Sequence, residues 1–173
     1  MCGKKPGVQE NGGVYLHACA FKLVADCMRK DRQKVEENIQ RMLPFSNTGT
    51  PIRDGEPYVF CNCYFAIENS YRFGTCGQSW GTGTAGWFYA ALLNHVYGLR
   101  PEPDGLRVDP CLPPSWKTCG VTRVFRGAVY HVAYEQKGSE GRTEQIKVNG
   151  DRFKGEHLPC TPGREYRVQV TLV

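Results

Sequence analysis

The stretch from Thr82 to Tyr97 is the feature that most limits how this chain can fold. From Ala85 onward its residues are apolar on nearly every side of a helix, and Gly98 follows as a stop signal. A helix of this kind is buried on all sides rather than along one stripe. We therefore expect a helix over about 82–97, buried inside a larger array of helices.

The segment directly before this helix has the composition of a ligand-binding turn, Ser79-Trp80-Gly81-Thr82-Gly83-Thr84-Ala85-Gly86-Trp87. Its glycines let the backbone approach another group closely, and Thr82 or Thr84 is suited to cap the helix. The first amides of a helix have no partner inside it, so they attract a phosphate, sulfate or carboxylate group. A Gly-rich turn that packs tightly against neighbouring helices is the alternative, and this stretch alone favours neither.

Two amphipathic helices are expected ahead of that turn. In the first, six apolar residues recur with the helical period and define the face expected to be buried: Val14, Ala18, Phe21, Val24, Ala25 and Met28. His17 lies on the same stripe, either as a core histidine or as a functional donor next to the loop of residues 6–13. Asp31 is placed to cap the second helix, Pro44 ends it, and a surface loop is expected over 46–56.

The sequence pattern changes after Gly98. Residues 99–105 are expected to form a linker, and the β-rich runs that follow are divided by turns that contain glycine. These runs are 121–125, 128–134, 145–148 and 166–173, and they predict a small antiparallel sheet. The chain therefore has helices first and strands second, in two packing units. Three helices cannot enclose a core alone, so a partner or a longer chain is expected.

Composition and charge exclude several classes of protein. The 173 residues are 40% hydrophobic, and the net charge of +5 is spread along the chain. This spread argues against a polyanion-binding tail and favours a small anionic ligand. The sequence has no secretory signal and no apolar run that could span a membrane, so we expect a cytoplasmic protein whose nine cysteines are reduced.

A metal site is the alternative use of three of these cysteines, Cys61, Cys63 and Cys76. Their Cys-x-Cys spacing differs from that of zinc ribbons, and no fourth ligand is close in the sequence. Buried thiols that act as small hydrophobic groups are therefore expected, with no bound metal.

Three motifs follow one another along the chain: Glu10–Ala18 (ENGGVYLHA), Ser79–Trp87 (SWGTGTAGW) and Gly105–Trp116 (GLRVDPCLPPSW). Together they resemble the C-terminal part of the inverting disaccharide phosphorylases of glycoside hydrolase family 94. The resemblance implies an α+β chain with two domains. Residues 1–112 would be the C-terminal portion of an (α/α)6-barrel catalytic domain, and residues 113–173 a small antiparallel β-sandwich domain.

The resemblance also implies an enzyme activity. Inorganic phosphate, a co-substrate rather than a cofactor, attacks a β-linked disaccharide of the chitobiose or cellobiose type and gives an α-sugar 1-phosphate and a free sugar. The family's general acid, an aspartic acid, belongs to an earlier segment that this sequence does not match. We therefore expect a fragment, with Met1 internal or a truncated start, that is inactive alone and belongs to a homodimer.

Two other functions remain open from the sequence. One is a stand-alone carbohydrate-binding or degenerate module without catalysis, which uses neither phosphate nor a general acid. The other is a hydrolase of related barrel fold, which needs a second carboxylate to activate water.

The resemblance assigns roles to five residues. His17, Thr82 and Gly83 match the positions that hold phosphate in the family, in agreement with the anion-binding reading of the turn. Gln9 and Glu10 are expected to face the sugar in the leaving subsite, or else to form hydrogen bonds within their loop. Trp80 and Trp87 are further candidates for stacking on a sugar ring, although Trp87 belongs to the apolar helix and is also suited to the core.

Overall fold

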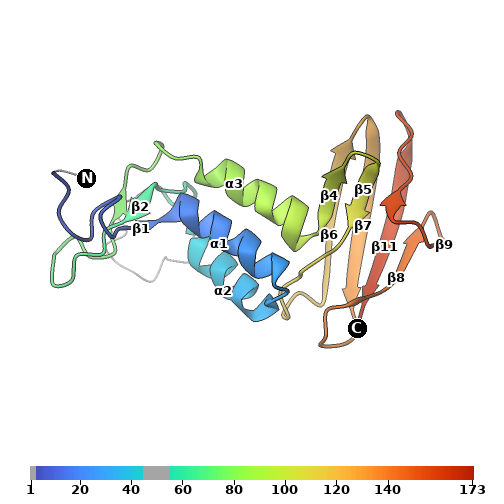
Figure 1. Ribbon diagram of the computed structural model, residues 1–173, viewed down its shortest axis with the longest axis horizontal. Coiled ribbons are helices and arrows are strands. Elements are labelled where there is room, and N and C mark those ends of the chain that lie inside the picture. The colour runs from blue at the N-terminus through green and yellow to red at the C-terminus, as the bar shows by residue number, and fades with distance from the viewer. Residues whose placement is uncertain (1–2, 45–54) are drawn as a thin grey trace. The chain divides into compact units, whose positions relative to one another are not determined.

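The computed structural model describes residues 3–44 and 55–173, which form two compact units. Of the described residues, the helical unit contains 3–25, 37–44 and 55–91, and the sheet unit contains 26–36 and 92–173. In the described residues there are three α-helices and three β-sheets (Figure 1), so the predicted mixture of helices and sheets is confirmed. Most of the predicted surface loop over 46–56 lies outside the described residues.

Two of the three α-helices, the second and the third, begin next to residues that the sequence predicts as caps. The three helices are α1 (Leu16–Met28), α2 (Arg32–Met42) and α3 (Thr84–Ala91). Oδ1 of Asp31 accepts the amide N–H of Lys34 at 3.2 Å, as expected of an N-cap. Hydrogen bonds from the side chain and from the backbone amide of Lys34 hold the pKa of Asp31 below its usual value. The predicted cap of α2 is therefore confirmed.

A small antiparallel sheet, in the order β1-β2-β3, precedes and positions the start of α1. Its strands are β1 (Val14–Tyr15), β2 (Cys63–Tyr64) and β3 (Cys76–Gly77). Residue 14 therefore belongs to a strand, and α1 begins two residues later. The sheet connects the loop before α1 with the segment before α3.

The predicted buried face of α1 is wrong. The buried apolar residues are Leu16, Ala20, Leu23 and Cys27, a second apolar stripe with the same helical period. Phe21 and Met28, on the predicted stripe, are 48% and 69% exposed. The helix has apolar residues on two faces, and burial goes to the face with the two leucines. Periodicity alone does not separate the two faces.

The helix over 82–97 also differs from the prediction. It begins at Thr84, and its last part, Leu92–Val96, is a π-helix (η2) rather than an α-helix. It is not buried on every side, because Trp87 and Tyr89 are 49% and 64% exposed. The described residues contain three α-helices, which do not make up the larger array expected around this segment. None of these three helices is long and apolar enough to cross a membrane.

The predicted linker over 99–105 is instead a β-hairpin. Strands β4 (Leu99–Glu102) and β5 (Gly105–Val108) pair antiparallel, and β10 (His157–Leu158) adds to the other edge of β5. The proline and glycine residues that suggested a linker lie in or next to the tight turn of this hairpin. Turn residues and linker residues have the same composition, which is why the prediction failed.

The larger sheet of this unit has five strands in the order β6-β7-β11-β8-β9 (Figure 1). They are β6 (Thr118–Phe125), β7 (Ala128–Gln136), β8 (Thr143–Val148), β9 (Asp151–Phe153) and β11 (Glu165–Leu172). The four predicted β-runs are confirmed as β6, β7, β8 and β11. The prediction of an antiparallel sheet is wrong in one respect, because β11 pairs parallel with β7 and antiparallel with β8.

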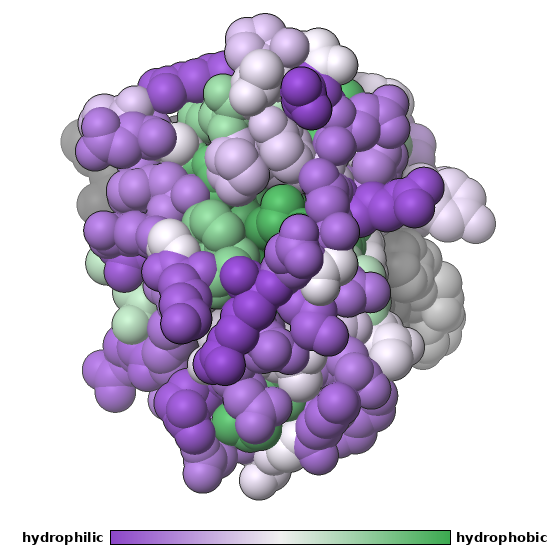
Figure 2. Space-filling model, turned by 90° about the vertical axis from the view of Figure 1, so that its right-hand side faces the viewer, coloured by the Kyte–Doolittle hydropathy of each residue, from purple (hydrophilic) through white to green (hydrophobic). Residues whose placement is uncertain are grey.

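One face of this sheet is buried. Alternate residues of β7 and β11 have almost no exposed surface, and Tyr130 stacks on Tyr166 across the parallel pair with 5.4 Å between ring centroids. The hydroxyl of Tyr134 donates to the carbonyl oxygen of Tyr97 at 2.6 Å and so fixes the end of η2 on the sheet. The face of the molecule in Figure 2 is mostly hydrophilic, with small apolar patches between the polar side chains.

Asn62 connects the start of α1 to the turn before α3. Its backbone oxygen accepts the amide N–H of Leu16 at 3.0 Å, and its Nδ2 donates to the carbonyl oxygen of Gly81 at 3.0 Å. One residue therefore holds both segments that carry the predicted phosphate-binding residues.

Gly98 allows a close crossing in the sheet unit. Its φ is +66°, and a Cβ placed there would lie 2.1 Å from the backbone carbon of Asp109. We expect Gly98→Ala to lower the free energy of unfolding by more than about 2 kcal/mol, since it adds both backbone strain and overlap. Chemical denaturation measures this change. Gly150→Ala is the control, because its φ is +96° with nothing within 4 Å; equal losses would contradict the overlap argument.

The bond from Asn62 to Gly81 also leads to a prediction. Asn62→Ala removes the Nδ2 donor and keeps the backbone bond to Leu16, so we expect amides 82–86 to exchange about fivefold faster with solvent. Hydrogen exchange measured by NMR or mass spectrometry tests this. Asn11→Ala is the matched control, because its Nδ2 donates to the carbonyl oxygen of Lys4 in another loop. If both variants change these amides equally, Asn62 does not hold the turn.

Candidate functional site

His17 is the second residue of α1, and its ring lies among aromatic side chains. The ring centroids of Phe21 and Trp87 are 5.1 and 5.7 Å from that of His17, and Phe21 and Trp87 meet edge to face at 4.9 Å. The hydroxyl of Tyr15 is 3.4 Å from Nδ1 of His17. Nε2 is buried, and no group among the described residues forms a hydrogen bond with it. The ring is therefore held on one side and has one unused polar atom.

The start of α3 supplies unused donors. Oγ1 of Thr82 accepts the amide N–H of Thr84 at 3.1 Å, and the carbonyl oxygen of Gly83 accepts the amide N–H of Trp87 at 3.1 Å. The sequence offers Thr82 and Thr84 as caps, and in the structure Thr82 is the one whose side chain caps the helix. The next amides, those of Ala85 and Gly86, lie in the first turn, where an α-helix provides no internal acceptor. The positive end of the helix dipole adds to their attraction for an anion.

The structure brings His17 and the start of α3 together. A Cβ built on Gly83 would lie 3.2 Å from Cε1 of His17 and 3.5 Å from Cδ1 of Trp87. The imidazole therefore rests against the backbone of residue 83, where only glycine leaves enough room without a shift of the ring. His17 and Gly83 are separated by 66 positions in the sequence, so no local pattern gives this distance.

Gln9 and Glu10 are placed in the turn before β1. The backbone of Gln9 has a φ of +46°, its carbonyl oxygen accepts the amide N–H of Gly13 at 3.0 Å, and its own amide bonds to the thiol of Cys63. Burial raises the pKa of that thiol, and the bond to Gln9 opposes the shift. Glu10 is exposed and lies 3.8 Å from Nζ of Lys4. None of these bonds involves His17, so the role of Gln9 and Glu10 toward a sugar stays a prediction.

The tryptophans of the turn differ in their surroundings. Trp80 is 77% exposed, and its Nε1 donates to Oε1 of Glu56 at 2.8 Å. Trp87 is half exposed and supports the ring of His17. Sequence reasoning missed Tyr15 and Phe21 as neighbours of His17. The spacing of four residues between His17 and Phe21 on one helix is a signal that would have found the second.

The cysteines do not form a metal centre in the part of the chain that the structure describes. All eight cysteines there are free thiols, and Cys61, Cys63 and Cys76 are buried. No group of three His, Cys, Asp or Glu side chains in residues 3–44 and 55–173 is arranged to hold a metal ion.

Curated relatives match nearly the whole chain. It is 35% identical, over 98% of its length, to a 3-O-beta-D-glucopyranosyl-beta-D-glucuronide phosphorylase from Paenibacillus borealis, and covers 22% of that protein. It is also 34% identical, over 99% of its length, to a solabiose phosphorylase from the same organism, and it covers 23% of that protein. An N,N'-diacetylchitobiose phosphorylase from Vibrio furnissii is 33% identical over 96% of the chain, which covers 21% of it.

The chain thus spans about a fifth of the length of the curated relatives that it matches. A family model described as the catalytic domain of the glycosyl hydrolase 94 superfamily matches residues 1–98. This match includes His17 and the whole turn before α3. Since the model covers more than half of the residues, the chain belongs to the glycosyl hydrolase 94 superfamily.

Proposed function

We propose that this chain is the C-terminal part of an inverting glycoside phosphorylase, and that His17, Thr82 and Gly83 bind its inorganic phosphate. The observation that carries the proposal is the buried Nε2 of His17, which has no partner among the described residues and belongs to a ring that rests on Gly83. Membership of the family and the phosphorylase names of its relatives support the same reading.

The donors around Gly83 suit a phosphate dianion. When the hydroxyl of Tyr15 donates to Nδ1, the proton of a neutral His17 is on Nε2, where it is available to a phosphate oxygen. The unused amides at the start of α3 and the hydroxyl of Thr82 provide further donors. Hydrogen bonds to a charged acceptor are stronger than neutral ones, so a buried donor of this kind favours an anion.

The proposed reaction needs one acid. A phosphate oxygen attacks the anomeric carbon of a β-linked disaccharide, the bond to the bridging oxygen breaks, and a general acid gives its proton to that oxygen. The products are an α-sugar 1-phosphate and a free sugar. No base is required, because phosphate takes the place that a base-activated water occupies in an inverting hydrolase. We assign the acid to a part of the longer protein outside this chain, as the short coverage of the relatives suggests.

The remaining parts of the proposal rest on the family. The relatives' names differ in the sugars that they specify, so we propose a β-linked disaccharide of the chitobiose or cellobiose type without choosing between them. Residues 1–112 would complete an (α/α)6 barrel, residues 113–173 would form the following β-domain, and the whole protein would be a cytoplasmic homodimer. Gln9 and Glu10 would contact the leaving sugar.

Phosphorolysis by the longer protein that contains this chain tests the phosphate site. We expect His17→Ala to raise the KM for phosphate by about 10- to 100-fold, the loss of one hydrogen bond to a charged group. Gly83→Ala should also raise it, because the new Cβ would lie 3.2 Å from the ring of His17. Release of sugar 1-phosphate is the measurement.

Gly81→Ala is the matched control, since a Cβ at residue 81 would meet only Cβ of Gln78, at an ordinary contact distance of 3.8 Å, and lies in the turn before the same helix. It should leave the KM for phosphate unchanged. An unchanged KM in His17→Ala would show that the phosphate site is wrongly assigned. Release of free sugars without sugar phosphate would instead indicate a hydrolase.

A further inference from the structure

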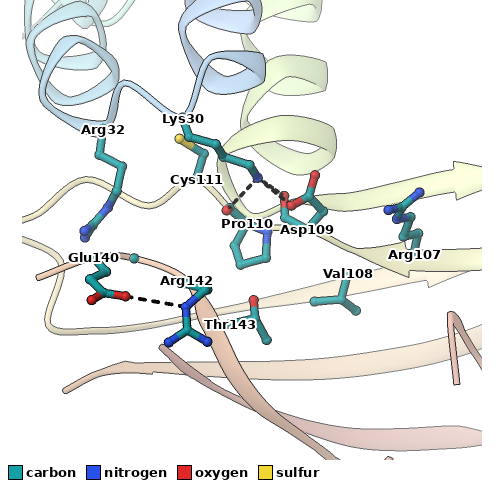
Figure 3. A pocket seen from close by; sticks show the side chains of 11 residues that line it. Lys30, Arg32, Arg107, Val108, Asp109, Pro110, Cys111, Glu140, Arg142 and Thr143 are labelled. Atoms are coloured by element: carbon teal, nitrogen blue, oxygen red, sulfur yellow. Dashed lines mark hydrogen bonds and ion pairs between the residues drawn. The ribbon is translucent and has the colours of Figure 1, made fainter. Parts of the chain in front are cut away.

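A second candidate site lies in the sheet unit and shares no residue with the site around His17. It is a cavity of about 370 Å³ formed by the turn between α1 and α2, the end of β5, and the segment that leads into β8 (Figure 3). This volume is within the range of small-molecule sites, about 300–1,000 Å³. Its charged lining consists of four cations and two carboxylates: Lys30, Arg32, Arg107, Arg142, Asp109 and Glu140.

Arg32 is a buried cation without a counter-ion. Only 9% of the residue is exposed. Nε donates to the carbonyl oxygen of Leu112 at 2.9 Å, Nη1 to that of Ser139 at 2.6 Å, and Nη2 to the side-chain oxygen of Gln136. All three acceptors are neutral, and no carboxylate pairs with Arg32 among the described residues. Since a guanidinium has five N–H donors, two are left for a ligand.

The segment before β8 forms a wall against this guanidinium. Gly141 has a φ of +71°, and a Cβ there would lie 2.4 Å from Nε of Arg32, so the backbone itself covers the charged group. Two backbone hydrogen bonds with Val173, of 3.2 and 3.0 Å, hold Arg142 in place next to it. In Figure 3, Arg32 extends toward the segment that carries Glu140 and Arg142. The cavity is therefore shaped by fixed backbone and not only by surface side chains.

The two carboxylates of the cavity do not balance Arg32. Asp109 lies between two other cations, because its Oδ1 is 2.5 Å from Nζ of Lys30 and its Oδ2 bonds to Arg100. Glu140 is 68% exposed at its side chain and faces Nε of Arg142 at 3.4 Å. A buried charge without a partner is unfavourable, and an anion in the cavity would relieve this cost.

We propose that this cavity binds the phosphate group of a small molecule, either free phosphate or a sugar phosphate, between the guanidinium groups of Arg32 and Arg142. Guanidinium groups bind phosphate oxygens through paired N–H donors. Thr143 lines the same cavity and supplies a hydroxyl donor. The proposal goes beyond the phosphate site at His17 and does not depend on it.

Titration calorimetry with inorganic phosphate on the intact protein carrying His17→Ala tests this site separately. We expect binding to remain in that variant and to weaken by at least about tenfold when Arg142→Gln is added. The Arg142 side chain is 70% exposed, so its replacement is not expected to unfold the protein, whereas Arg32 has structural bonds and is left intact. Phosphate should also raise the melting temperature of the His17→Ala protein but not of the double variant.

Arg152→Gln is the control, because this exposed arginine of β9 lies outside the cavity. It should leave phosphate binding unchanged. Titrations with α-glucose 1-phosphate and with glucose identify the source of the group: tighter binding of the sugar phosphate than of phosphate indicates a sugar phosphate, and the reverse indicates free phosphate. Equal phosphate binding with and without Arg142→Gln, or equal weakening by Arg152→Gln, would overturn the proposal. If the phosphate site proposed at His17 proved wrong, the results expected here would not change.

Discussion

The contact between the ring of His17 and the backbone of Gly83 is the constraint on which the candidate site depends. The imidazole fills the space that a side chain at residue 83 would occupy, so the ring of His17 lies directly beside the start of α3. This contact requires both helix starts to be held firmly. Asn62 does so from between them, with a backbone acceptor for Leu16 and a side-chain donor for Gly81. Without such support, neither helix start alone would be a specific site.

The sheet unit contains two charged side chains, Asp109 and Arg32, with opposite surroundings. Asp109 lies between two cations, whereas Arg32 is buried among neutral oxygens, so no carboxylate of the described residues balances the charge of Arg32. A lysine at residue 32 would not reproduce this arrangement, because three bonds in fixed directions need a planar guanidinium. The same geometry that holds the turn between α1 and α2 on the unit also leaves donors for a ligand.

Local sequence signals predicted the elements, and long-range contacts decided what those signals left open. The cap at Asp31, the start of α3 after Thr82 and the four main β-runs follow from residue type and period, and the structure has them. The buried face of α1 does not follow, because Phe21 and Leu23 lie on different apolar stripes of one helix. The hairpin at 99–108 does not follow either, because its turn residues have the same composition as a linker. Of the site, the residue types were predictable, and the distance from His17 to Gly83 was not.

The parallel pairing of β11 with β7 has a consequence for how the sheet forms. The pairs β6–β7 and β8–β9 are local hairpins that can form as soon as each is synthesised. Between them, one edge of β7 and one edge of β8 stay open until residues 165–172 are inserted and bond to both. A chain released after residue 164 would carry two unpaired strand edges, one on β7 and one on β8, and unpaired edges are templates for aggregation. Strand β11 therefore joins the two hairpins into one sheet.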